Sequence, residues 1–295
     1  MLGLAAGLLL PGLARMLYPW LAEMVAILLL LTAMRIGLRA AVGAVQDLRW
    51  GLAAVATLQL ALPLLAYAAL AVFGLQQTPA ALALVLACAA PAISGSPNLA
   101  LLLGQDAGRM MQILVLGTAA FPITVLPVLA LFPQLGPAAE VMQAAVTLLV
   151  VIAFSTGIGF ALRRLFVGVP TPSQIKAMDG ATTLAFSIIV VGLMAALNPA
   201  LRSTPGVVAL WALLAFAISY GLQFTTLAVL RRTSLQPVAG PLAIGAGSRN
   251  IALFLVALPP DVLQPLLIFV GCWQLPMYLT PVLLPRLYRW GAPRE

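Results

Sequence analysis

The sequence predicts an all-α polytopic membrane protein with ten transmembrane helices. Hydrophobic residues make up 63% of the 295 residues and charged residues only 7%, and the mean hydropathy is +1.12. A soluble domain carries about 25% charged residues, so this chain has too little charge to coat a water-exposed surface. Its apolar stretches are long enough to cross a bilayer, and short turn-forming sequences separate them.

Ten apolar segments follow one another along the chain. A membrane-spanning helix needs about 20 mostly apolar residues, and Arg15 limits the length of the first segment. The expected segments are 1–18, 20–41, 50–74, 79–104, 107–133, 137–162, 177–198, 205–230, 238–258 and 261–287.

The basic residues alternate in a way that supports this number of segments. With ten segments, Arg15 and Arg202 fall on one side of the membrane and Arg249 falls within it. The other twelve fall on the opposite side: Arg35, Arg39, Arg49, Arg109, Arg163, Arg164, Lys176, Arg231, Arg232, Arg286, Arg289 and Arg294. The positive-inside rule then predicts a multi-pass protein of the inner (plasma) membrane with both termini in the cytoplasm. We expect lipid contacts and no nucleic-acid partner, since no solvated basic face is predicted.

The chain also contains an internal repeat. Residues 95–103 (GSPNLALLL) recur as 247–255 (GSRNIALFL), with six of nine positions identical. A Pro-x4-Pro-Val-Leu pattern starting at Pro122 recurs at Pro276. Two halves of five helices each, 1–136 and 137–295, must insert in opposite orientations, which predicts an inverted-topology repeat.

Each half carries one segment that Gly and Pro residues interrupt. Segment 79–104 contains Pro91, Gly95 and Pro97, and segment 238–258 contains Gly240, Gly245 and Gly247. Either segment alone is also typical of a kinked helix that packs through small residues. Two copies at matching positions favour discontinuous helices that cross near the membrane midplane, where their ends can bind a substrate or an ion.

Arg249 is the most informative single residue, because a central arginine is costly to insert into a membrane. A carboxylate such as Glu23, the carbonyls of a broken helix, or an anionic ligand would offset that cost. Asn98 and Asn250 occupy equivalent positions in the two copies. The candidate substrate-binding residues are Ser96, Asn98, Arg249, Asn250 and Gln59.

Other polar residues in the apolar segments are weaker candidates. Thr182, Thr183 and Ser187 share a helical spacing that fits a cavity or another helix equally well. Without histidine, Glu23 or Asp179 would have to carry any proton coupling. An enzyme is not expected, since the sequence lacks clustered carboxylates and metal-ligand spacing, and we expect no cofactor and no metal.

The sequence resembles the bile acid:sodium symporter family over essentially its whole length. The residues that carry the resemblance are 59–63 (QLALP), the stretch from Pro91 to Asp106, and the Gly-x-x-Asn-x-x-Leu pattern that starts at Gly247. The resemblance implies ten helices in a panel domain and a core domain, with the fourth and ninth helices crossing in the core. It also implies transport by alternating access, in which one domain moves against the other.

The departures from this resemblance concern the sodium sites. Sodium-coupled members carry Glu-x-Gly-x-Gln-Asn in the second crossing helix, where this chain has Gly245 and Arg249 in place of glutamate and glutamine. A serine and a threonine of the following helix correspond to Met110 and Leu114. The sodium site is therefore expected to be lost, with Arg249 as a tethered substitute cation, because its guanidinium stays protonated.

The expected function is the sodium-independent secondary transport of small organic anions. Two alternatives stay open: an arsenite-efflux-type carrier of the same superfamily, favoured only by Cys88, and a symporter that is still sodium-coupled.

Overall fold

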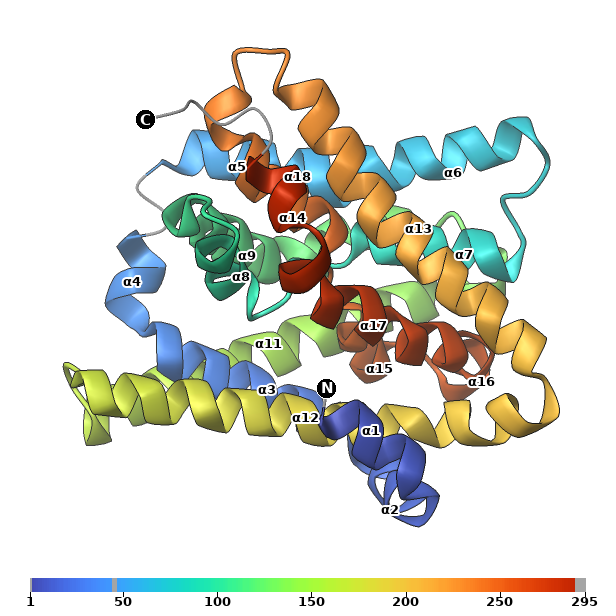
Figure 1. The fold of residues 1–295 in the computed structure, drawn as a ribbon, viewed down its shortest axis with the longest axis horizontal. Helices are drawn as coiled ribbons and strands as arrows, with labels where there is room; N and C mark the ends of the chain where they lie inside the picture. The colour runs from blue at the N-terminus through green and yellow to red at the C-terminus, as the bar shows by residue number, and fades with distance from the viewer. Residues whose placement is uncertain (1, 44–46, 290–295) are drawn as a thin grey trace.

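The structure, a computed structural model, describes residues 2–43 and 47–289, so that Arg294 of the charge count lies outside the described residues (Figure 1). Within these residues the chain is 85% helical and contains no strand. This confirms the prediction of an all-α protein. Several of its helices are long and apolar enough to cross a membrane, as expected of a membrane-embedded protein.

Five helical stretches have the length and composition of membrane spans. They are Pro11–Ile36, Leu48–Val72, Ala138–Phe166 (α11), Pro172–Ser203 (α12) and Pro205–Leu230 (α13). The first stretch joins α2 (Pro11–Leu17), η1 (Tyr18–Trp20) and α3 (Leu21–Ile36), and the second joins α5 (Leu48–Ala56), η2 (Thr57–Ala61) and α6 (Leu62–Val72).

Shorter helices make up the rest of the described chain. In the first half they are α1 (Leu2–Leu9), α4 (Leu38–Gly43), α7 (Pro79–Ala89), α8 (Ser96–Leu102), α9 (Ala107–Thr124), α10 (Leu126–Leu129) and η3 (Pro133–Leu135). In the second half they are η4 (Gln236–Val238), α14 (Ala239–Gly247), η5 (Ile251–Leu253), α15 (Phe254–Ala257), α16 (Pro260–Leu263), η6 (Gln264–Leu266), α17 (Leu267–Leu283) and α18 (Pro285–Arg289).

The N-terminal region differs from the expected single segment 1–18. The helix is interrupted at Leu10, whose backbone is not helical (φ −117°, ψ 69°), and α2 starts at Pro11. Proline crowds the residue before it out of the helical conformation, which explains the break. The apolar stretch long enough to span a membrane therefore starts at Pro11 rather than at the first residue.

Helix α12 is longer than the expected 177–198. It begins at Pro172 because Thr171 and Gln174 form a reciprocal capping box at its N-terminus. It continues through Pro199 to Ser203, where the preceding turn accommodates the proline. Because α12 begins before residue 177, it includes Lys176, and Asp179 lies further from the start of the helix than expected.

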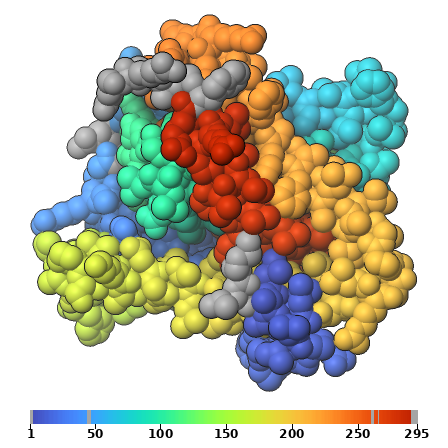
Figure 2. All heavy atoms as spheres, in the orientation of Figure 1, coloured from blue at the N-terminus to red at the C-terminus, as the bar shows by residue number. Residues whose placement is uncertain are grey.

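Helices α7 and α14 are largely buried. Every residue of α14 is buried, as are all residues of α7 from Ala81 to Ala89 except Leu84. Both helices are apolar all round, which is the pattern of a helix surrounded by other helices. In Figure 1, α14 lies beside α13, and α3 packs against both α11 and α12. Figure 2 shows the C-terminal helices, in red, between the orange α13 and the green chain near residue 100.

Close helix contacts depend on small residues. A Cβ at Gly247 of α14 would collide with the backbone carbonyl of Ser219 in α13, and a Cβ at Gly159 of α11 would collide with the carbonyl of Leu30 in α3. Small residues at such contacts let helices approach closely in a membrane, where the hydrophobic effect does not drive them together.

Candidate functional site

The two interrupted segments lie against each other at their breaks. Helix α7 ends at Ala89, α14 ends at Gly247, and the residues that follow form an antiparallel bridge between Ala92 and Arg249. The Ile93 amide donates to the Ser248 carbonyl at 3.0 Å, and the Asn250 amide donates to the Pro91 carbonyl at 2.8 Å. Each break thus supplies hydrogen bonds that the other needs, which is how unwound backbone is tolerated at membrane depth.

The guanidinium of Arg249 is held at this crossing by three backbone carbonyls. Its side chain is only 1% exposed. Nε donates to the carbonyl of Ala246 at 2.9 Å, one Nη to Ala90 at 2.8 Å, and the other Nη to Leu58 at 2.9 Å. The acceptors belong to the end of α14, the residue after α7, and η2. One cation therefore joins three separate segments of the chain.

Two of these carbonyls are free because their helices end there. The last carbonyls of a helix have no partner within it, and the helix dipole makes that end favourable for a cation. Ala246 lies in the last turn of α14, and Ala90 directly follows α7. The placement of Arg249 therefore follows from the two breaks.

The third carbonyl is free because of Pro63. The Leu62 amide donates to Thr57 five residues earlier, so η2 is a π-helical turn. In this register the carbonyl of Leu58 would bond the amide of residue 63, but proline has no amide hydrogen. The carbonyl of Leu58 therefore accepts from Arg249 instead.

The structure decides between the partners that the sequence allowed for Arg249. The carbonyls of the broken segments satisfy it, as one alternative proposed. The alternative of a pairing with Glu23 is not realised, because Glu23 is exposed at the start of α3 and forms no ion pair among the described residues. Arg249 also does not line the large cavity described below.

Gln59 is buried next to the crossing and makes a structural contact. It is 2% exposed, and its Oε1 accepts a hydrogen bond from Oγ1 of Thr124 in α9 at 2.8 Å. The amide of Gln59 also lies close to Gly117 of α9, where a Cβ would clash with it. Gln59 thus joins the π-helical turn to α9, and it does not line the large cavity.

The remaining predicted site residues divide between the crossing and the cavity. Ser96 is fully buried, Asn250 is 8% exposed, and Asn98 is exposed and lines the cavity. Among the described residues, the hydroxyl of Ser96 and that of Ser248, its counterpart in the repeat, have no hydrogen-bond partner. Of the five candidates, only Asn98 faces the cavity.

The cavity has a volume of about 380 Å³ and lies beside the first break. Its wall is mostly apolar. The break and α8 contribute Ile93, Ser94, Gly95, Pro97, Asn98, Leu99 and Leu102. The opposite wall comes from α3, α12 and α17, with Leu28, Thr32, Arg35, Ile36, Asp179, Thr182, Thr183, Phe186, Met277, Tyr278 and Pro281, while Met111 and Leu114 come from α9.

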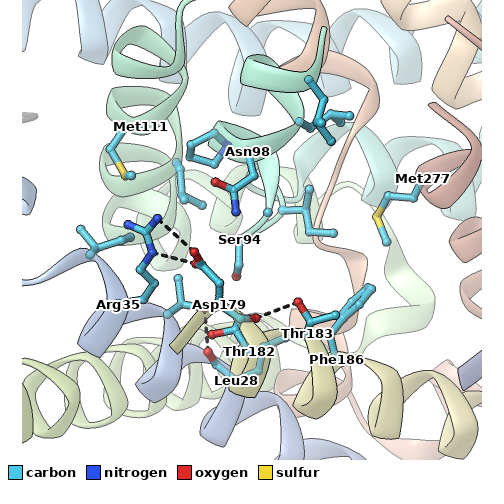
Figure 3. A pocket seen from close by; sticks show the side chains of 18 of the residues that line it. Leu28, Arg35, Ser94, Asn98, Met111, Asp179, Thr182, Thr183, Phe186 and Met277 are labelled. Carbon is cyan, nitrogen blue, oxygen red and sulfur yellow. Dashed lines mark hydrogen bonds and ion pairs between the residues drawn. The ribbon is translucent and has the colours of Figure 1, made fainter. Parts of the chain in front are cut away.

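Arg35 and Asp179 form an ion pair on the cavity wall, and the sequence analysis did not identify this pair. Nε of Arg35 lies 2.8 Å from Oδ1 of Asp179 (Figure 3). Arg35 was assigned to the basic side of the membrane and Asp179 to a segment end. The available signal was that both charges fall inside expected apolar segments, 20–41 and 177–198.

Thr182 and Thr183 line the cavity, but both hydroxyls already donate to backbone carbonyls of their own helix, those of Met178 and Asp179, at 2.8 Å. They can therefore accept but not donate a further hydrogen bond. Ser187 makes the same kind of bond to Thr183 and does not line the cavity.

No protein-family model matches the chain, and no curated protein matches it.

Proposed function

We propose that this chain is a secondary transporter of small organic anions that works by alternating access. In this proposal it has ten membrane-crossing segments in two inverted five-helix repeats, with the panel and core domains that the resemblance to bile acid:sodium symporters implies. The observation that carries the proposal is that two helices, broken at equivalent positions of a sequence repeat, pair at their breaks directly beside a mostly apolar cavity of about 380 Å³.

The cavity has the character of a transport site. Ile93, Ser94 and Gly95 belong to the break and also line the cavity, so any movement of the crossing changes the cavity wall. The cavity is mostly apolar with a few polar groups, which is typical of sites for small organic molecules. The broken helices at the crossing are typical of secondary transporters.

Arg249 supports the proposal of sodium independence. A sodium ion needs oxygen ligands, and the crossing gathers three carbonyls, but all three accept hydrogen bonds from a guanidinium. Around Gly245, the position that resembles the sodium-binding glutamate, a Cβ would meet Leu58, Ile113 and Met110 at 3.2, 3.3 and 3.6 Å. The space beside it is therefore filled by hydrocarbon and a thioether.

The proposed orientation puts the charged end of the cavity on the cytoplasmic side of the inner membrane. Arg35 lies there, and Arg163, Arg164 and Lys176 belong to the ends of helices α11 and α12 nearby in sequence. The positive-inside rule favours this orientation. An arsenite carrier gains no support, because the thiol of Cys88 is fully buried and does not line the cavity.

The first experiment measures the uptake of radiolabelled aromatic and aliphatic monocarboxylates into proteoliposomes, in sodium buffer and in choline buffer. We expect saturable uptake of at least one of them at the same rate in both buffers. Uptake that needs sodium would overturn the tethered-cation proposal and favour a sodium symporter. A lack of uptake of every organic anion, together with uptake of arsenite, would overturn the assignment as a whole.

A second experiment tests the role of Arg249 through the variant Gly245→Glu/Arg249→Gln/Met110→Ser. The third substitution is needed because Met110 occupies the space that a glutamate at position 245 would enter. We expect sodium to raise the melting temperature of this variant but not that of the wild-type protein, because a ligand that binds only the folded state stabilises it. The matched control is Gly245→Glu/Met110→Ser with Arg249 retained, which should not respond to sodium.

A further inference from the structure

The ion pair between Arg35 and Asp179 is accessible from the cavity. Arg35 lies in the last turn of α3, and Asp179 is the eighth residue of α12. Nε donates to Oδ1 at 2.8 Å and Nη2 to Oδ2 at 3.5 Å, while the two side chains are 31% and 37% exposed. Part of the guanidinium fork therefore remains available to another oxygen ligand.

A second guanidinium, that of Arg163, contacts the backbone at Arg35 but does not line the cavity. Arg163 of α11 donates to the carbonyls of Met34 and Arg35, at 3.1 and 2.5 Å, and so caps the end of α3. It lies against Gly37, whose positive φ of 75° lets the chain turn away there. The backbone of Arg35 is thus held by Arg163, while the Arg35 side chain is paired with Asp179.

The opposite wall offers polar groups that have no partner in the protein. Ser94 and Asn98 face the space in front of Asp179 (Figure 3). Among the described residues, neither the hydroxyl of Ser94 nor the amide of Asn98 takes part in a hydrogen bond. Next to these polar groups the wall consists of apolar side chains, among them Ile93, Phe186 and Met277.

We infer that Arg35 is the anchor for the charged head group of an amphipathic organic monoanion and that Asp179 is its resting partner, which the ligand displaces. The inference rests on the proposed function and names the subsite that recognises the substrate. A carboxylate or sulfonate fits the planar guanidinium fork in two-point contact. The amide of Asn98 and the hydroxyl of Ser94 donate to the same head group, and the hydrocarbon body lies against the apolar wall.

Asp179 has a defined role in this arrangement. In the empty cavity it keeps Arg35 paired, and in the occupied cavity it competes with the ligand. A half-exposed ion pair is weak, so the ligand can exchange with it readily. Removing the carboxylate should therefore strengthen anion binding, whereas a merely structural ion pair would give no such gain.

The test measures binding of 4-phenylbutyrate to the full-length protein in lipid nanodiscs by isothermal titration calorimetry, with its uncharged amide as the matched ligand. We expect Asp179→Asn to bind 4-phenylbutyrate about fivefold more tightly than wild type, which corresponds to the strength of a half-exposed ion pair. Arg35→Gln should bind about tenfold more weakly or not measurably, since it loses a charge-assisted hydrogen bond. The amide should bind all three proteins equally weakly.

Two exposed residues of the same helix region provide matched control variants. Arg39→Gln removes a basic residue one turn beyond Arg35, and Glu23→Gln removes an acidic residue from α3, and neither lines the cavity. Both should bind 4-phenylbutyrate as the wild-type protein does. Arg35→Lys keeps the positive charge but lacks the planar guanidinium. Its affinity for 4-phenylbutyrate should lie between those of wild type and Arg35→Gln, and this graded result distinguishes a loss of the anchor from misfolding.

The inference is overturned if Asp179→Asn binds 4-phenylbutyrate no more tightly than it binds the amide. It is also overturned if Asp179→Asn binds 4-phenylbutyrate no more tightly than the wild-type protein does. Uptake by the same variants in proteoliposomes separates this result from failure of the proposed function. If Arg35→Gln takes up the carboxylate at the wild-type rate, only the role of Arg35 as the anchor is overturned. Binding that follows Arg35 without any uptake would overturn the transporter and leave the anchor standing.

Discussion

The crossing and the cavity of this molecule use arginine in opposite ways. At the crossing, Arg249 is 1% exposed and donates only to backbone carbonyls. In the cavity, Arg35 is 31% exposed and is paired with a carboxylate. A guanidinium whose partners are backbone atoms of three segments holds those segments together, whereas one with a single side-chain partner can exchange it. This difference is the reason why we propose a structural role for Arg249 and a recognition role for Arg35.

Loss of Arg249 is expected to have the largest effect on stability. Arg249→Met leaves the carbonyls of Leu58, Ala90 and Ala246 without their donor, and each buried acceptor that loses its partner costs about 1–3 kcal/mol. We expect the free energy of unfolding to fall by about 4 kcal/mol, measured by thermal unfolding in nanodiscs. Arg39→Met is the control for an exposed arginine. If the Arg249→Met variant is as stable as wild type, Arg249 does not have the structural role given to it above.

The equivalent glycines of the two breaks should respond differently to alanine. At Gly247 a Cβ would collide with the backbone of Ser219 and the side chain of Gln223, whereas at Gly95, which lines the cavity, it would meet open space. Overpacking costs about 1–3 kcal/mol, so Gly247→Ala should destabilise by about 3 kcal/mol and Gly95→Ala by less than about 0.5 kcal/mol. Urea or thermal unfolding of the two variants measures this difference, and equal effects would contradict it.

The contact between Gln59 and Thr124 should contribute a smaller amount. Thr124→Val removes the hydroxyl that donates to Oε1 of Gln59 and leaves that oxygen buried without a protein donor. We expect a loss of about 1 kcal/mol in thermal unfolding, and no change in anion affinity, because neither residue lines the cavity. A loss of affinity larger than the loss of stability would place Gln59 in the binding site after all.

The smallest effect concerns a second half-exposed ion pair, between Arg109 and Asp47, which lies outside the large cavity. The hydrogen bond from Arg109 holds the pKa of Asp47 below its ordinary value. A carboxyl group with a lowered pKa stabilises the fold above its unfolded pKa, and this contribution is lost as the pH falls through the folded value.

Arg109→Gln should therefore raise the pKa of Asp47 from its lowered value. The free energy of unfolding of the variant should then depend less on pH than that of the wild-type protein in the acid range below about pH 4. Anion affinity should not change. NMR titration of the Asp47 carboxyl group measures the pKa and calorimetry the anion affinity. A change in anion affinity equal to that of Arg35→Gln would show that general surface charge, and not the cavity, attracts the ligand.

The sequence was most informative about the fold and least about partners. Composition predicted the membrane helices, and the repeated Gly-Ser-x-Asn pattern led to the two breaks that pair in the structure. The carbonyl partners of Arg249 could not be predicted in detail, because every residue carries a carbonyl and only the register of η2 and Pro63 frees that of Leu58. Hydrophobic patterns contain no such information.

The pairing of Arg35 with Asp179 could not be predicted for a related reason. The two residues are 144 positions apart, and their contact depends on how α3 packs on α12. Periodicity shows which face of a helix is apolar but not which helix it contacts. The extra first turn of α12 also depended on the capping box at Thr171, which placed Asp179 deeper in the helix than the expected segment did.

The fixed position of Arg249 has a consequence for energetics. A coupling ion that binds on one side of a membrane and dissociates on the other transfers free energy from its own gradient to the substrate that is transported with it. A guanidinium bonded to the chain returns with the protein in every cycle and releases nothing on either side. A carrier built around such a group can equilibrate or exchange its substrate, but the charge at its crossing cannot drive accumulation, so an anionic substrate that moves alone follows its own electrochemical gradient.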